Sequence, residues 1–197
     1  MYAELFISIG ILLLLAFTNK RRGGFSLKEM VILAMLTALA SASRVVLMAI
    51  PNAKPTSFII ISTGMIMGGG AGLVVGLLVP LISNFVLGMG PWLPWQMGLW
   101  GLMGLFAPVI RGKNRILQSC YGFIWGLVFG WVMNLWYYAD GMMPFSLRAY
   151  ALSCVGSFSF DITHAIVNAL LLLVFSGKWL EHILNVSGIE CDQKKAG

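Results

Sequence analysis

The stretch SNFVLGMGPWLPWQM, residues 83–97, interrupts a chain that is otherwise almost continuously apolar. Gly88 and Gly90 tolerate positive φ, while Pro91 and Pro94 lack a backbone N–H, so one helix can end here and another can begin. The stretch also contains tryptophan and amide side chains that can contact a ligand. We therefore predict that residues 83–97 connect two helices and form the mouth of a binding site.

The composition around this break is that of an integral membrane protein. Of 197 residues, 59% are hydrophobic and 10% are charged, which is too apolar for a water-soluble domain. The formal charge of +6 comes from Lys and Arg in short clusters between apolar runs, a pattern typical of cytoplasmic loops. We therefore expect lipid, and no nucleic acid, as a partner.

Apolar runs separated by polar or glycine-rich breaks predict seven membrane helices, since a bilayer core requires about 20 apolar residues. They cover residues 2–18, 26–50, 55–68, 70–87, 93–110, 115–138 and 147–176. Gly156 and Ser157 could divide the last run into an outer segment and a true span. The fold class predicted is all-α, with an N-terminal helix and basic loop at 1–25, a bundle at 26–180 and a polar cytoplasmic tail at 181–197.

The first run, residues 2–18, could be mistaken for a signal peptide. Glu4 precedes it and Lys20, Arg21 and Arg22 follow it, which is the reverse of a secretory signal. We predict a retained helix whose N-terminus lies outside the cell.

The basic residues test this topology. Those at 20–28, 111–115 and 178–195 all fall on one side of the membrane when seven spans alternate, and by the positive-inside rule that side is cytoplasmic. The C-terminus is then cytoplasmic, and the break at 83–97 faces outward.

Three polar residues of the last run share one helix face. Asp161, His164 and Asn168 are spaced i, i+3, i+7. Polar and ionisable groups inside a membrane are costly unless they are paired or meet a cavity. We predict that they line a substrate cavity; the alternative is a hydrogen-bond network that holds the bundle together.

Two cations lie at or near the outer membrane surface. Arg44 is at the outer end of the second run and Lys54 is in the loop that follows. Either could pair with Asp161, meet an anionic ligand or extend to the interface. Because a guanidinium suits bidentate recognition of phosphate or carboxylate, Arg44 is the preferred substrate anchor.

The remaining candidates for the cavity lie near the outer surface. They are Asn84, Trp92, Trp95, Gln96 and Asn134. Tryptophans are also common in the interfacial belt of membrane proteins, but Trp92 and Trp95 occupy a constrained loop, where they could act as a lid over the ligand.

The second run carries small residues every four positions, Ala34, Ala38 and Ala42. Such a stripe lets another helix approach closely. Packing within the bundle and contact with a separate subunit are both compatible with the spacing.

Catalytic and metal-binding motifs are absent from the sequence. GxSxG, HExxH and GxxxxGK[ST] do not occur, and Cys120, Cys154 and Cys191 lack the spacing of a metal site or a disulfide framework. We expect no catalytic residue, metal or cofactor. The alternatives are an intramembrane enzyme that uses Asp161 and His164 as acid and base, and a packing subunit without a ligand.

Residues 28 to 180 resemble the substrate-binding S-components of energy-coupling factor (ECF) vitamin transporters. The resemblance rests on the alanine stripe and on the segments PNAKPT at 51–56, SNF at 83–85, GPWLPWQM at 90–97 and FDITHAIVN at 160–168. It implies a six-helix S-component bundle, to which residues 2–18 add one N-terminal helix. It also implies that the protein binds a vitamin in an outward cavity, topples within the membrane and releases the vitamin inside.

The resemblance also implies the partners and the ligand. An S-component docks on a transmembrane scaffold subunit with two ATPase subunits, here through Ala34, Ala38 and Ala42, in the prokaryotic plasma membrane. The segments PNxKP and GPWxPWQM are most similar to the subgroup associated with cobalamin or a precursor such as α-ribazole. An S-component for a different vitamin is the alternative.

Overall fold

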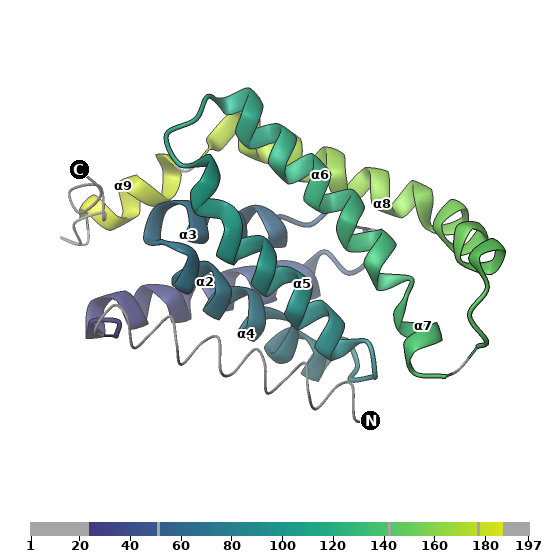
Figure 1. Cartoon of the computed structure of the whole chain (residues 1–197). Helices are drawn as coiled ribbons and strands as arrows, with labels where there is room; N and C mark the ends of the chain where they lie inside the picture. Colours follow the sequence, from purple (N-terminus) through teal and green to yellow (C-terminus); the bar gives the residue numbers. More distant parts are fainter. Residues whose placement is uncertain (1–23, 51, 142, 177, 187–197) are drawn as a thin grey trace.

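The computed structural model describes residues 24–50, 52–141, 143–176 and 178–186, and the regular elements in these ranges are helices (Figure 1). They are α2 (Leu27–Val46), α3 (Thr56–Met67), α4 (Gly69–Leu87), α5 (Leu93–Phe106), the 3₁₀ turn η1 (Ala107–Ile110), α6 (Arg115–Met133), α7 (Trp136–Ala139), α8 (Leu147–Phe175) and α9 (Lys178–Val186). The prediction of an all-α membrane bundle is confirmed, and the helix predicted at 2–18 lies outside the described residues.

Five helical segments in the described ranges are long and apolar enough to cross a membrane. They are α2, α4, α5 with η1, α6 with α7, and α8. The apolar helix α3 is shorter, at about 18 Å, and does not match the thickness of a bilayer core of about 30 Å.

The break at residues 83–97 connects two helices, as predicted. Helix α4 ends at Leu87, and the residue that caps it, Gly88, has a φ of 107°, which favours glycine. Helix α5 begins after Trp92 with Pro94 in its first turn, where a missing N–H costs nothing. Gly90 is needed for space, because a side chain there would overlap the ring of Trp92.

Helix α3 is the central element of the bundle. Its residues from Thr56 to Ile66 are all buried, as expected for a helix that is apolar all round. It packs against α2, α4 and α5. Its first turn therefore lies within the protein, where Thr56 and Ser57 are 2% and 0% exposed.

Glycines bring α3, α4 and α5 into backbone contact. A Cβ atom at Gly72 of α4 would overlap the carbonyl of Gly104 on α5 and the Cα of Gly64 on α3. Small residues at such crossings let membrane helices approach closely. Together with α2, which packs against α4 and α3, these three helices form a closely packed unit of α2 to α5.

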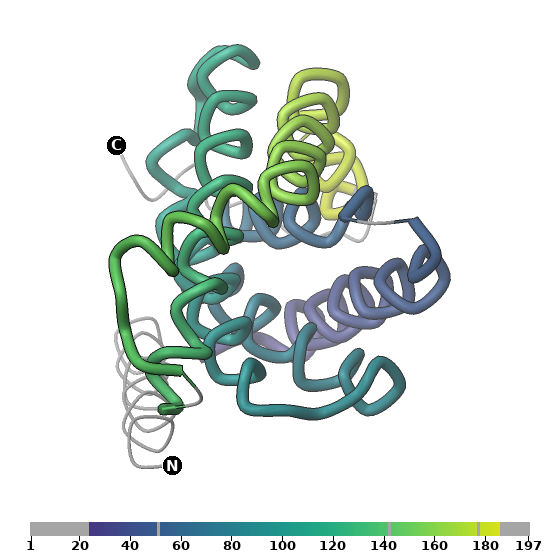
Figure 2. Tube along the Cα trace, turned by 90° about the vertical axis from the view of Figure 1, so that its right-hand side faces the viewer, coloured from purple at the N-terminus to yellow at the C-terminus, as the bar shows by residue number. Residues whose placement is uncertain are grey.

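Helices α6 and α8 form a pair along one side of this unit, and the two views agree on this arrangement (Figures 1 and 2). Helix α8 is continuous over 29 residues, so the possible division at Gly156 and Ser157 is not observed. A continuous helix satisfies its own backbone groups in lipid, and Gly156 faces open space.

Helix α9 covers one end of the bundle. Leu180 and Leu184 are buried in the core cluster, and the indole of Trp179 donates to Ser62 Oγ at 3.2 Å. The polar tail expected from residue 181 thus begins inside a helix that packs on the bundle.

Candidate functional site

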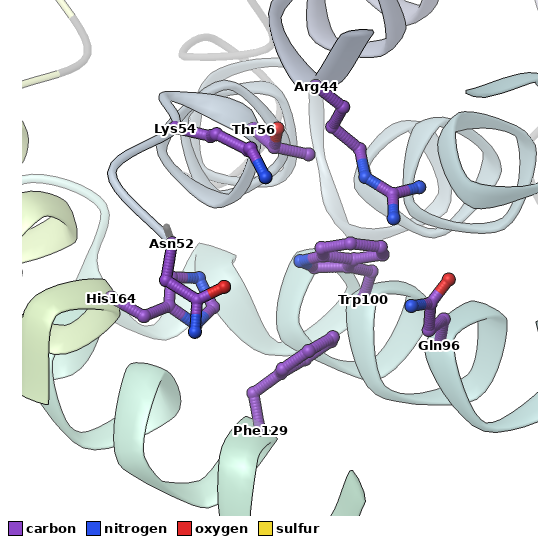
Figure 3. A pocket seen from close by; sticks show the side chains of 8 residues that line it. All are labelled: Arg44, Asn52, Lys54, Thr56, Gln96, Trp100, Phe129 and His164. Carbon is purple, nitrogen blue, oxygen red and sulfur yellow. The ribbon is translucent and has the colours of Figure 1, made fainter. Parts of the chain in front are cut away.

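An open pocket lies between the unit of α2 to α5 and the pair of α6 and α8. The space in and in front of the pocket, counted together with open solvent at its mouth, is about 430 Å³. Figure 3 shows the lining side chains, which are Arg44, Asn52, Lys54, Thr56, Gln96, Trp100, Phe129 and His164. They come from the end of α2, the loop between α2 and α3, the first turn of α3, and the helices α5, α6 and α8.

A buried serine connects the two sides of the pocket. Trp100 Nε1 donates to Ser57 Oγ at 2.9 Å, and His164 Nε2 lies 2.8 Å from the same oxygen. The indole N–H can only donate, so Ser57 Oγ accepts from it. In the second hydrogen bond, either Ser57 Oγ or His164 Nε2 is the donor, depending on the imidazole tautomer. Helices α3, α5 and α8 are thereby joined at one hydroxyl group.

Aromatic rings form one wall of the pocket. The rings of Trp100 and Phe129 lie 4.6 Å apart between centroids, and Phe129 meets the His164 ring edge-on at 5.3 Å. Such a surface can contact the flat face of a conjugated ring.

Two cations approach the pocket from the side opposite Phe129 (Figure 3). Arg44 donates to Ser83 Oγ, and its guanidinium carbon lies 4.7 Å from the centroid of the Trp100 ring. Burial lowers the pKa of Lys54, and the positive charge of Arg44 lowers it further. Neither cation forms an ion pair with a carboxylate in the part of the chain that the structure describes.

Of the nine predicted substrate-binding residues, Arg44, Gln96 and His164 line this pocket. Asn84 lies behind Gln96, since its Nδ2 donates to Gln96 Oε1 at 2.9 Å. Asn84 is 2% exposed and can therefore orient the glutamine without lining the pocket.

Asp161 and Asn134 meet in a separate network between α6 and α8. Asn134 Nδ2 donates to Ser157 Oγ at 2.9 Å, and that hydroxyl donates to Asp161 Oδ2 at 2.8 Å. Arg44 and Lys54 thus do not pair with Asp161. This geometry is the interhelical network that the sequence left as an alternative.

Asn168 lies one helical turn beyond His164, away from the pocket. It is 0% exposed, and its side-chain amide has no hydrogen-bond partner among the described residues. The shared face predicted for α8 therefore places only His164 in the pocket lining. A ligand role for Asn168 stays a prediction.

The two tryptophans of the break do not line the pocket. Trp92 packs against Trp136 of α7 with 5.6 Å between ring centroids, and Trp95 is half-buried at the start of α5. Their assignment as a lid stays a prediction.

The predicted set omitted several lining residues. Asn52, Lys54 and Thr56 belong to the segment PNAKPT, and Trp100 follows Gln96 by four residues, which places both on one helix face. That spacing was a usable signal. Phe129 had none, because one more aromatic residue in an apolar helix is unremarkable in a sequence.

The alanine stripe faces outward. Ala34, Ala38 and Ala42 are all exposed, whereas residues such as Leu36 and Ala40 turn toward the core. The stripe is therefore not used for packing within the described bundle. In the described ranges, no group of three His, Cys, Asp or Glu residues could hold a metal ion.

The comparisons with known proteins agree with this architecture. The family model "ECF-type riboflavin transporter, S component" matches residues 24–176. No curated protein and no solved structure matches the chain. The family match does not support the predicted cobalamin or α-ribazole subgroup. The chain belongs to the family of ECF-type riboflavin transporter S-components.

Proposed function

We propose that this protein is the substrate-specificity subunit of an ECF importer and that it binds a fused heterocyclic vitamin in the pocket between α3, α5, α6 and α8. The observation that carries this proposal is the aromatic wall of Trp100 and Phe129, surrounded by polar side chains. Small-molecule sites typically combine apolar or aromatic walls with a few polar groups that fix orientation.

The proposed roles follow from position. Trp100 and Phe129 contact the flat ring, and Asn52, Thr56, Gln96 and His164 offer hydrogen bonds to its polar edges. Asn84 holds Gln96 in place. Ser57 orients both Trp100 and His164.

Riboflavin is the first ligand to test because of the family match. α-Ribazole shares its chemistry, since both molecules carry a dimethylbenzo-fused nitrogen heterocycle with a chain or ring derived from a five-carbon sugar.

Transport by toppling on a scaffold subunit with two ATPases is part of the proposal. The exposed alanine stripe of α2 supports it, because the small side chains leave room for a partner helix. Replacing Ala38 by Trp should block assembly with the ECF module without changing vitamin binding. Ile124→Trp, on the exposed face of α6, is the control that should leave assembly intact.

An intramembrane enzyme is the less supported alternative. Asp161 and His164 bond to different partners, Ser157 and Ser57, so the proposed acid and base do not form a pair.

Vitamin binding by the purified protein tests the proposal. Riboflavin, α-ribazole and a panel of other vitamins are titrated by calorimetry, and mass spectrometry identifies any small molecule carried through purification. We expect ATP-independent binding that weakens about tenfold or more in Phe129→Ala, because the ring loses a stacking partner.

Phe106→Ala provides the matched control, since Phe106 is an exposed phenylalanine of α5 away from the pocket. If the folded protein binds no member of the panel, the proposal is wrong.

A further inference from the structure

The pocket holds two positive charges that no carboxylate among the described residues neutralises. Arg44 and Lys54 both point to the space beside Trp100 (Figure 3). Arg44 is only 8% exposed, and Lys54 is partly buried. Neither meets a carboxylate within the described residues. Two like charges in a partly desolvated site repel each other and lose hydration.

Neutral groups compensate Arg44 only in part. It donates to the Ser83 hydroxyl and lies against the negative face of the Trp100 ring. It also occupies the last turn of α2, where the helix dipole favours a cation. These contacts position the guanidinium at the pocket wall and leave its net charge in place.

Lys54 has no comparable compensation. It lies two residues before α3, so the helix end nearest to it is the positive one. The N-cap residue of α3, Pro55, provides no side-chain acceptor for the first N–H groups, and Thr56 of that first turn lines the pocket. Lys54, Arg44 and the start of α3 therefore converge as three sources of positive potential.

We infer that the pocket takes an anionic ligand, in which a phosphate monoester or carboxylate lies between Arg44 and Lys54 at the start of α3 while a heterocycle contacts Trp100 and Phe129. The inference rests on the proposed function for the heterocycle and goes beyond it in the charge of the ligand. A neutral vitamin would leave both cations unpaired, whereas an anion satisfies both by charge-assisted hydrogen bonds.

Matched pairs of ligands test the charge separately from the ring. Riboflavin is compared with riboflavin 5′-phosphate, α-ribazole with its 5′-phosphate, and a flavin bearing an N10-carboxymethyl group distinguishes carboxylate from phosphate. At least one anionic member should bind about tenfold or more tightly than its neutral parent at low salt. Which anion shows the larger gain identifies the source of the charge.

Variants locate the effect. Lys54→Gln should reduce the preference for the anion over its neutral parent to within about threefold. Arg44→Lys keeps a charge in the buried site if Arg44→Gln does not fold, and it should weaken the preference through loss of the planar fork. Lys113→Gln, an exposed lysine in the turn before α6, should leave the preference unchanged.

The outcomes separate this inference from the proposed function. Tight binding of a neutral parent with equal or weaker binding of every anion overturns the anionic ligand and leaves the vitamin-binding function intact. An anion preference that survives Lys54→Gln and both Arg44 substitutions also overturns it. Failure of all five compounds to bind the folded protein overturns the anionic ligand, and failure of the whole vitamin panel contradicts the proposed function as well.

Discussion

Glycine is used differently at the two main helix interfaces of this protein. Between α4 and α5, Gly72 and Gly104 place backbone against backbone. Between α6 and α8, Gly126 approaches the backbone of Ala165, but Gly122 faces a side chain of Leu172 and Gly130 faces the carboxylate of Asp161. At the first interface, Gly72 and Gly104 keep the two backbones close together. The second interface combines one backbone approach with space for side chains, including a buried acid.

Burial differs in the same direction. In the membrane segment of α4, 56% of the residues are buried, whereas the shares are 17% in the segment of α6 with α7 and 28% in that of α8. The pocket lies between these groups, with Arg44 and Trp100 on the closely packed unit and Phe129 and His164 on the exposed pair. Pocket geometry therefore depends on a few polar contacts that join α6 and α8 to the unit of α2 to α5. Examples are the hydrogen bonds of Ser57 with His164 and of Tyr121 with the Met103 carbonyl.

The largest effect is expected where backbones touch. Gly72→Leu should lower the free energy of unfolding by about 3 kcal/mol or more, because the new side chain would overlap backbone atoms that cannot move independently. Thermal unfolding in detergent measures this. Gly156→Ala, where nothing lies within 4 Å, is the control and should change stability by no more than about 1 kcal/mol. Equal stability of the two variants would show that the backbone contact between α4 and α5 does not require glycine at position 72.

The second interface should respond less, and in a way that depends on one side chain. Gly130→Ala should cost about 1 to 2 kcal/mol, because the Asp161 carboxylate must shift away from the new methyl group. In an Asp161→Ala background the same change should cost less, with a coupling of at least about 0.5 kcal/mol in a double-mutant cycle. Strict additivity would show that the cost at Gly130 does not come from the Asp161 carboxylate.

The connection between the two groups can be tested at Ser57. Ser57→Ala removes the acceptor of the Trp100 indole and the partner of His164, so it should weaken vitamin binding about tenfold and lower stability by about 1 to 2 kcal/mol. Ser62→Ala removes the acceptor of Trp179 in the middle of α3, outside the pocket lining. It should lower stability without weakening binding. Loss of affinity in both variants would indicate a general loosening of α3.

The smallest effect concerns pH. Desolvation and the nearby Arg44 lower the pKa of Lys54 below the ordinary lysine value, so its charge is lost earlier as pH rises. The preference for an anionic ligand should therefore decline a few-fold between about pH 7 and about pH 10. Arg44 and His164 are the other ionisable groups that line the pocket. Lys54→Gln should make the profile flat, and a decline that persists in this variant would assign it elsewhere.

The helix boundaries were largely predictable from sequence. Apolar runs and glycine or proline breaks located α2 to α6 and α8 within a few residues, because each backbone must satisfy its own hydrogen bonds in lipid. The short elements η1 and α7 were not separated from the runs 93–110 and 115–138. Helix α9 was missed. Its sequence, KWLEHILNV, is too polar for a span, and only packing on the bundle buries Leu180 and Leu184.

The candidate site was predictable only in part. Helical spacing put Asp161, His164 and Asn168 on one face of α8. That face extends beyond the pocket, and the crossing with α6 gives the three residues different neighbours. Likewise, the sequence could not decide whether Arg44 pairs with Asp161, since that depends on the distance between α2 and α8.

Hydropathy, backbone hydrogen bonding and charge along one chain establish that this is a helical membrane protein, where α2 to α6 and α8 begin and end to within a few residues, and which residues are costly to bury. The tertiary structure alone decided which costly residues satisfy each other. It pairs Asp161 with Ser157 and His164 with Ser57, and it leaves Arg44 and Lys54 together without a carboxylate from the described residues. Such pairings depend on distances between helices, which glycine contacts and crossing geometry set and local sequence does not encode.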